Sequence, residues 1–225
     1  MMKPTVLAVA LLAWTGPLAA QDPLITIPDA YKVQFENAWV KVVRVHYAAG
    51  AKLPVHTHPP GTTAYLYLND SDGVVFRHES GSSRAVTRPA VKAGSMRVAT
   101  GPSETHNAEN PAATPSDFLK VHFKTASDGP RNLRRRIPRN ATDAAPLTRE
   151  EFSNGQMRIW RLIVPAGKSV EVRTPDGQPA LLITLMSGQE RWVDAGQVEA
   201  VTNTGTTPME LIRIDFLTAP AAPVN

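Results

Sequence analysis

Histidine is the residue type in this chain best suited to chemistry, and all six histidines lie within the first 122 positions. His56 and His58 are two residues apart in an extended stretch, so their rings point to the same face of a strand. One strand can offer two ligands to one metal ion in this way. The chain has no cysteine, so only His, Asp and Glu side chains are available as metal ligands.

Short segments rich in β-branched and aromatic residues must position these side chains. Glycine and proline turns follow them, and long helical periodicity is missing. This pattern predicts an all-β fold of the sandwich or barrel type. The strand segments are residues 39–47, 65–68, 73–77, 118–123, 158–164, 181–185 and 211–216.

The chain contains an internal repeat. Residues 35–58 align with residues 152–175 at a constant offset of 117, and residues 110–125 align with residues 203–218 at an offset of 93. The second copy therefore lacks 24 residues from its middle, the difference between 117 and 93. A repeat of this kind predicts two all-β units that arose by internal duplication.

The repeat also divides the chain. The predicted segments are a first unit at 32–125, an Arg-rich linker at 126–149, a second unit at 150–218 and a tail at 219–225. The second unit is small for a closed barrel, so it is expected to lean on the first. The linker contains Arg131, Arg134, Arg135, Arg136 and Arg139 and is expected to be solvated. Binding to an anionic surface or to the acidic second unit is the alternative for this cluster.

Two histidine-containing motifs carry a family resemblance. Residues 50–58 read G-x5-H-x-H, and residues 106–110 read H-x3-N. With Gly50, His56, His58, His106 and Asn110 at these positions, the chain resembles the cupin superfamily over residues 32–218, and in particular its small secreted members. The resemblance implies a double-stranded β-helix, or jelly roll, in each unit, with one divalent metal ion (Zn, Cu, Mn, Fe or Ni) held by His56, His58 and His106.

The chain departs from the family pattern in both copies. Where the pattern places an acidic ligand, the first copy has Thr62 and Thr63. Glu104 is a candidate extra ligand, and a solvent-facing turn residue is the alternative for it. In the second copy the residues aligned with the three histidines are Arg173, Pro175 and Glu199. Arginine does not give up its proton to bind metal, so the second unit is expected to be metal-free and degenerate.

Other residues of the first unit were assigned by their surroundings. Tyr65, Tyr67 and Arg97 are candidate pocket residues, and a structural ion pair or cap is the alternative for Arg97. His122 shares a parity with Lys120 and alternates with apolar residues, so it is expected to face solvent. His46 and His78 are assigned no functional role. His46 is expected to be structural, and His78 lies in a segment that is predicted to be a turn.

A metal held by three histidines keeps coordination positions open, as a catalytic metal requires. The resemblance implies an enzyme acting on a small organic acid or other oxygenated metabolite, of the dioxygenase, decarboxylase, lyase or isomerase type. No residue is identified as the catalytic base. The alternatives are a non-catalytic cupin that binds a small ligand and a structural protein whose second unit forms a homodimer.

The N-terminus predicts export. Lys3 precedes an apolar stretch at residues 6–14, and Ala19 and Ala20 follow it. This layout is typical of a secretory signal peptide at residues 1–20 with cleavage near Ala20, and the stretch is too short for a stable membrane anchor. A periplasmic or secreted protein takes up its metal outside the cytoplasm, where the affinity order favours Zn or Cu.

Composition narrows the partners. The chain has 225 residues, and its hydrophobic fraction of 42% is too high for a disordered chain. The formal net charge is +4, and the segment 126–149 accounts for +4 with six Arg and two Asp, so neither folded unit is strongly basic. Only 6% of residues are aromatic. These values argue against nucleic acid as a partner, and a small-molecule ligand or substrate remains.

Overall fold

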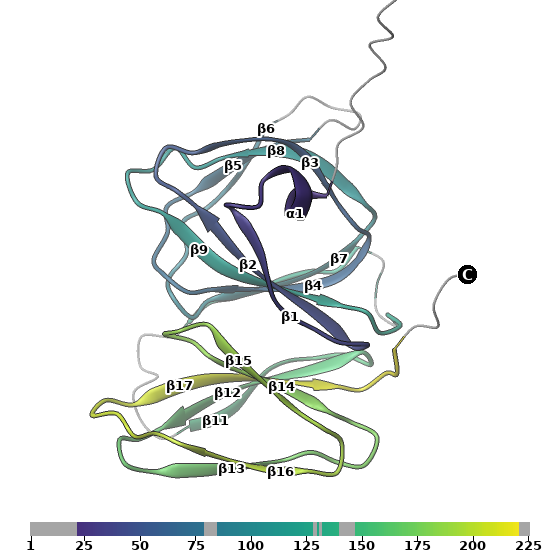
Figure 1. Ribbon diagram of the computed structural model, residues 1–225, viewed down its shortest axis with the longest axis vertical. Helices are drawn as coiled ribbons and strands as arrows, with labels where there is room; N and C mark the ends of the chain where they lie inside the picture. The colour runs from purple at the N-terminus through teal and green to yellow at the C-terminus, as the bar shows by residue number, and fades with distance from the viewer. Residues whose placement is uncertain (1–21, 79–84, 128–129, 131, 140–146, 221–225) are drawn as a thin grey trace, which may run out of the picture.

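The structure is a computed structural model that describes residues 22–78, 85–127, 130, 132–139 and 147–220. The regular secondary structure of the described chain is almost entirely strand, with one short helix, α1 (Pro23–Thr26), and the strands form two stacked barrels (Figure 1). The predicted all-β jelly-roll class is therefore confirmed. The expected signal peptide at residues 1–20 lies outside the described residues. Among the described residues no helix is long and apolar enough to cross a membrane.

The first barrel consists of two antiparallel sheets. Its six-stranded sheet has the order β1-β2-β9-β4-β7-β10, and its four-stranded sheet has the order β3-β8-β5-β6. The strands are β1 (Tyr31–Glu36), β2 (Val40–Tyr47), β3 (Lys52–His58), β4 (Gly61–Tyr67), β5 (Val74–His78), β6 (Ala85–Arg88), β7 (Met96–Gly101), β8 (Glu104–Glu109), β9 (Ser116–Phe123) and β10 (Arg134–Ile137).

The second barrel follows the same plan with fewer strands. Its five-stranded sheet has the order β11-β12-β17-β14-β15, and its two-stranded sheet pairs β13 with β16. The strands are β11 (Leu147–Ser153), β12 (Met157–Val164), β13 (Ser169–Arg173), β14 (Ala180–Thr184), β15 (Gln189–Val193), β16 (Val198–Thr202) and β17 (Met209–Phe216). No strand of the described second barrel takes the places of β5 and β6, and these two strands lie where the repeat alignment loses its 24 residues.

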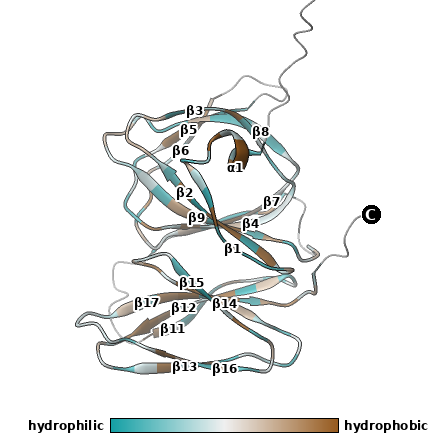
Figure 2. Ribbon diagram, viewed as in Figure 1, coloured by the Kyte–Doolittle hydropathy of each residue, from teal (hydrophilic) through white to brown (hydrophobic). Residues whose placement is uncertain are grey.

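The large sheets of the two barrels pack face to face and share one hydrophobic core. Fully buried residues of this core come from the first barrel, such as Val40, Leu119 and Val121, and from the second, such as Ile159 and Phe216. Figure 2 shows apolar segments on the strands where the two barrels approach each other. The outer face of the six-stranded sheet packs against the second barrel, and its inner face lines the interior of the first barrel. This sheet is therefore buried on both faces.

Equivalent residues of the two barrels make equivalent contacts across this interface. Arg161 donates from Nη2 to the Gly94 carbonyl at 2.7 Å, and Arg44, its repeat partner, donates from Nη1 to the Ser187 carbonyl at 3.0 Å. Gly188 corresponds to Gly94 and has a φ of 67°, and a Cβ there would lie 2.8 Å from Leu68. Reciprocal contacts of this kind are those of a symmetric dimer interface. Here they join two halves of one chain.

The segment expected to be a solvated linker is in part a strand, which corrects that expectation. Residues 134–137 form β10, which pairs with β7 and extends the six-stranded sheet at its edge. Ile137 is 5% exposed and belongs to the shared core. Arg139 forms an ion pair with Glu210 of the second barrel at 3.0 Å. An unpaired sheet edge, such as that of β7, readily accepts another strand. The strand β10 could not be predicted from the sequence, because its consecutive arginines show no alternation of polar and apolar residues.

Candidate metal centre

The three histidines of the two motifs come together inside the first barrel. His56 and His58 end β3, His106 lies in β8, and their candidate ligand atoms all lie within 4.8 Å of one another. The residues are 0%, 9% and 2% exposed, respectively. A register shift between Leu53 and His56 inserts an extra residue into β3, and beyond it His56 lies directly opposite His106. The β-bulge thus sets which residues of β3 face the barrel interior.

A fourth histidine, His78, lies beside these three. Strand β8 lies between β3 and β5, and His106 is opposite His56 on one side and His78 on the other. The interpretation of His78 as a turn residue without a role is therefore wrong, because it ends β5 beside the site. His78, Glu104 and His106 form a second trio of candidate ligands that shares His106 with the first.

The hydrogen bonds of the rings suit metal binding. The Pro54 carbonyl oxygen lies 2.8 Å from Nδ1 of His56, so a neutral ring donates there and keeps a lone pair on Nε2. The Tyr31 hydroxyl lies 3.2 Å from that Nε2. His106 is the decisive residue, because both of its ring nitrogens are buried and have no hydrogen-bond partner among the described residues. Buried polar atoms are rarely left in this state, and a metal ion would satisfy one of them.

Burial also sets the charge of the site. It lowers the pKa of His56 to about 4 and lowers the pKa values of His58 and His106 as well. The rings are therefore neutral at pH 7, the form that binds metal. Burial lowers the pKa of Lys120 to about 7, and its Nζ lies 2.8 Å from Nδ1 of His58.

Glu104 is not a solvent-facing turn residue. It begins β8, its side chain is 29% exposed, and its Oε1 lies 3.3 Å from Nδ1 of His78 and 3.7 Å from Nδ1 of His106. Interaction with the His106 ring lowers the pKa of the Glu104 carboxyl to about 2. The carboxylate is thus ionised beside the histidines, where it is available either as an extra ligand or as a partner that orients them.

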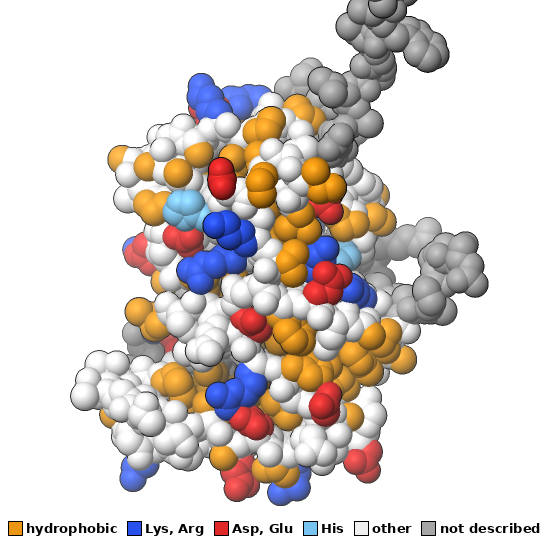
Figure 3. Space-filling view, in the orientation of Figure 1, with side chains coloured by type: hydrophobic (Ala, Val, Ile, Leu, Met, Phe, Trp, Pro, Cys, Tyr) orange, Lys and Arg blue, Asp and Glu red, His pale blue; other side chains and the backbone are white. Residues whose placement is uncertain are grey.

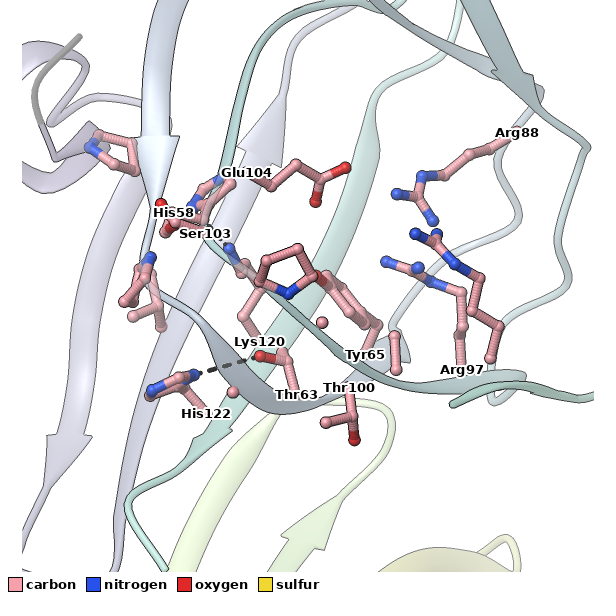
Figure 4. Close-up of a pocket in the computed structure, with 18 of the residues that line it drawn as sticks. His58, Thr63, Tyr65, Arg88, Arg97, Thr100, Ser103, Glu104, Lys120 and His122 are labelled. Atoms are coloured by element: carbon pink, nitrogen blue, oxygen red, sulfur yellow. Dashed lines mark hydrogen bonds between the residues drawn. The ribbon is translucent and has the colours of Figure 1, made fainter. Parts of the chain in front are cut away.

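The site adjoins a cavity of about 920 Å³, drawn in Figure 4. His58, Glu104, Lys120 and His122 line it. The expectation that His122 faces solvent is wrong, although the parity that it shares with Lys120 on β9 is correct. Their neighbours Leu119 and Val121 pack into the core between the barrels, so the opposite face of β9 looks into the first barrel. Alternation along a strand separates two faces and does not show which one meets water.

The candidate pocket residues have different positions. Tyr65 and Arg97 line the cavity, and the Arg97 guanidinium lies 3.8 Å from the centre of the Tyr65 ring. Tyr67 lines a smaller adjoining cavity. Arg97 forms no ion pair with any described residue, so its interpretation as a structural ion pair is not supported. Two residues that lacked any sequence signal, Tyr31 and Arg88, also line the main cavity.

The remaining predictions from the repeat concern His46 and the second barrel. His46 lies on the surface and pairs with Asp117 at 2.8 Å. In β13 Arg173 is exposed, whereas Val172, which is 0% exposed, lies opposite Glu199. The residue of the second barrel that takes the place of His56 is therefore Val172 rather than Arg173. Valine offers no ligand atom, so the expectation of a metal-free second barrel now rests on Val172 instead of Arg173.

Comparison with known proteins places this geometry in a fold family. No family model matches the chain, and no curated protein does. Among solved structures, YhhW from Escherichia coli has a TM-score of 0.55 at 13% identity, covering 85% of this chain and 91% of that chain. The same protein, as a bacterial pirin in complex with nickel(II), gives a TM-score of 0.53 at 13% identity over the same shares.

Two further structures agree with this assignment. AerE from Microcystis aeruginosa has a TM-score of 0.52 at 17% identity, covering 84% of this chain and 97% of that chain. Quercetin 2,3-dioxygenase from Acinetobacter baumannii has a TM-score of 0.53 at 12% identity, covering 84% and 78%. At such identities the likeness shows the fold. The chain shares the two-barrel jelly-roll fold of these proteins, which is the fold that the resemblance of the motifs implied.

Proposed function

We propose that this protein is a metal-dependent enzyme that acts on a small organic acid or a similar oxygenated metabolite. The observation that carries the proposal is the buried trio of His56, His58 and His106, in which both ring nitrogens of His106 have no hydrogen-bond partner among the described residues. The trio adjoins a cavity large enough for a small molecule. A closed structural site would not need such a space.

A divalent ion bound by these histidines would supply Lewis acidity or, for a redox-active metal, a site for oxygen chemistry. The chain's own groups bind and orient the substrate. Lys120 and Arg97 bring positive charge to the cavity, and Tyr31 presents a hydroxyl beside His56. The fold is shared with a nickel(II)-bound pirin and a quercetin 2,3-dioxygenase, and this supports metal-dependent chemistry.

Metal content tests the proposal. The protein purified from the compartment to which it is exported should contain about one equivalent of metal by elemental mass spectrometry, with Zn or Cu favoured. His56→Ala, His58→Ala and His106→Ala should each lose it. His46→Ala is the matched control, because His46 is a surface histidine of the same barrel. Folded wild-type protein without metal would contradict the enzymatic proposal and leave a binding or structural cupin.

We also propose that the protein is exported to the periplasm or secreted, on the basis of Lys3, the apolar stretch at residues 6–14 and the small residues before Gln21. N-terminal sequencing of protein from the periplasmic fraction should begin at or near Gln21. Recovery only in the cytosol with residue 1 intact would contradict this proposal.

A further inference from the structure

Two guanidinium groups without carboxylate partners lie in the cavity beside the candidate metal centre. Arg97 is only 8% exposed, and within the described part of the chain its buried Nε has no hydrogen-bond partner. Arg88, at the end of β6, is half-buried. No carboxylate of the described residues lies within ion-pair distance of either group. Buried arginines are normally paired, because an uncompensated buried charge is costly.

Aromatic rings hold both groups in place. The Arg97 guanidinium lies 3.8 Å from the centre of the Tyr65 ring, and the Arg88 guanidinium lies 4.6 Å from the centre of the Phe76 ring. The Phe76 ring in turn contacts the ring of His106, with centroids 5.0 Å apart. Stacking fixes the plane of each guanidinium and thus the direction of its N–H groups. The pair is therefore preorganised, and it is close to the metal centre.

The two positive charges also act on one another. Figure 4 shows Arg88 and Arg97 directed toward the same part of the cavity. Burial and the charge of Arg97 lower the pKa of Arg88. On the adjacent edge strand, Arg136 lies directly opposite Arg97 and also lines the cavity. On the face of the molecule shown in Figure 3, by contrast, basic and acidic side chains are interspersed.

We propose that Arg88 and Arg97 form a clamp that binds a carboxylate group of the substrate while another oxygen of the same molecule faces the metal centre. This inference rests on the proposed function and names its substrate class: compact carboxylic acids with a second oxygen function, such as dicarboxylic, hydroxy or keto acids. Guanidinium forks match the planar carboxylate and bind it with charge-assisted hydrogen bonds. A bound carboxylate would also give both guanidinium groups the ion-pair partner that no described residue supplies.

The second barrel offers a matched control. Arg191 lies opposite Leu182 as Arg97 lies opposite Tyr65, which makes the two arginines equivalent by register. Arg191 is satisfied by an ion pair with Glu199, and its side chain is 55% exposed. The variants to compare are therefore Arg88→Met, Arg97→Met and Arg191→Met. Arg97→Lys keeps the charge without the planar fork and serves where the methionine variant fails to fold.

The experiment measures binding of sodium malonate by calorimetry and by the shift in Tm, with sodium chloride at matched ionic strength as reference. Wild type and Arg191→Met should bind malonate and gain Tm. Arg88→Met, Arg97→Met and Arg97→Lys should bind it at least about tenfold more weakly, the loss expected for removal of charge-assisted hydrogen bonds. Malonate affinity unchanged in these three variants would overturn the clamp, as would tighter binding of sodium phosphate than of any carboxylate.

Repeating the titration with metal-free His56→Ala separates this inference from the proposed function. Arginine-dependent malonate binding that persists in His56→Ala supports the clamp whether or not the wild type binds metal. Malonate binding that depends on the histidines and not on the arginines would place the anion on the metal alone. That result would overturn the clamp and leave the proposed function standing.

Discussion

The two barrels share one strand order and differ in what fills them. The interior of the first barrel contains histidines, tyrosines, a lysine and arginines around a cavity. The interior of the second barrel is packed mainly with aliphatic side chains (Leu162, Val164, Val172, Leu182, Val193 and Leu211). Its buried Asp215 is paired with Arg213 and with the Trp160 ring nitrogen. The fold therefore does not require a polar interior. The polar residues of the first barrel call for an explanation in terms of function rather than stability.

Two local differences separate the barrels. The bulge between Leu53 and His56 has no counterpart in the continuous pairing of β13 with β16. Pro54 lies in the bulge, where its missing N–H is tolerated. The second difference is the β5–β6 hairpin, which contributes Phe76, His78 and Arg88 to the first barrel. A bulge that directs β3 and a hairpin that closes one wall together distinguish a candidate site from a packed core.

The largest expected contrast concerns metal. His106 and Glu199 correspond by register, since His106 is opposite His56 and Glu199 is opposite Val172. His106→Ala should remove essentially all bound metal, because three ligands become two, whereas Glu199→Ala should leave the metal content unchanged. Dialysis against ZnCl₂ followed by elemental mass spectrometry measures both. Equal metal loss in the two variants would mean that the barrels do not differ as described.

The next contrast concerns the repeat partners Arg161 and Arg44. Arg161 is 0% exposed and contacts Glu151, Glu210 and the Gly94 carbonyl, whereas Arg44 is exposed. Arg161→Met should lower the free energy of unfolding by about 3 kcal/mol, because it leaves buried carboxylates short of a partner. Arg44→Met should change it by less than about 0.5 kcal/mol. Urea denaturation of both variants is the test, and similar losses would contradict the asymmetry.

A smaller effect tests the register of the second barrel. Val172→His should cost about 2 kcal/mol of stability, because it buries a polar ring among aliphatic side chains. Arg173→His should be nearly neutral, since Arg173 is exposed. The same urea experiment applies. A larger cost at position 173 than at 172 would restore the ungapped alignment of Arg173 with His56.

Much of the fold and part of the site could be predicted from the sequence. The spacing of His56 and His58 is a local property, and the second motif supplied His106. The role of His78 depends on the pairing of β5 with β8, which no local pattern reveals. The orientation of His122 was predicted wrongly because alternation along β9 is a local pattern. The packing of the second barrel against the other face of β9 is not local and leaves no such pattern. A functional role for Arg88 is indicated only by the structure, which places it over the Phe76 ring and near the charge of Arg97.

The smallest expected effect is the pH dependence of a histidine, a residue type that only the first barrel contains. Burial lowers the pKa of His122 to about 4, from an ordinary value near 6.5. The unfolded chain therefore binds this proton first, and the folded protein loses stability as pH falls from about 6.5 to about 4. In metal-free protein, His122→Gln should reduce that loss by about 1–2 kcal/mol, after discounting for partial exposure.

Urea unfolding at pH 7 and pH 4.5 measures this difference, with His46→Gln as the control. His46 is a surface histidine in contact with Asp117, so its replacement should not flatten the acid side of the stability curve. If His122→Gln retains the full acid sensitivity of the wild type, the ring of His122 is solvated rather than buried in the barrel. The polar interior of the first barrel would then not include His122 on β9. The difference between the two barrels would be limited to the histidines on β3, β5 and β8.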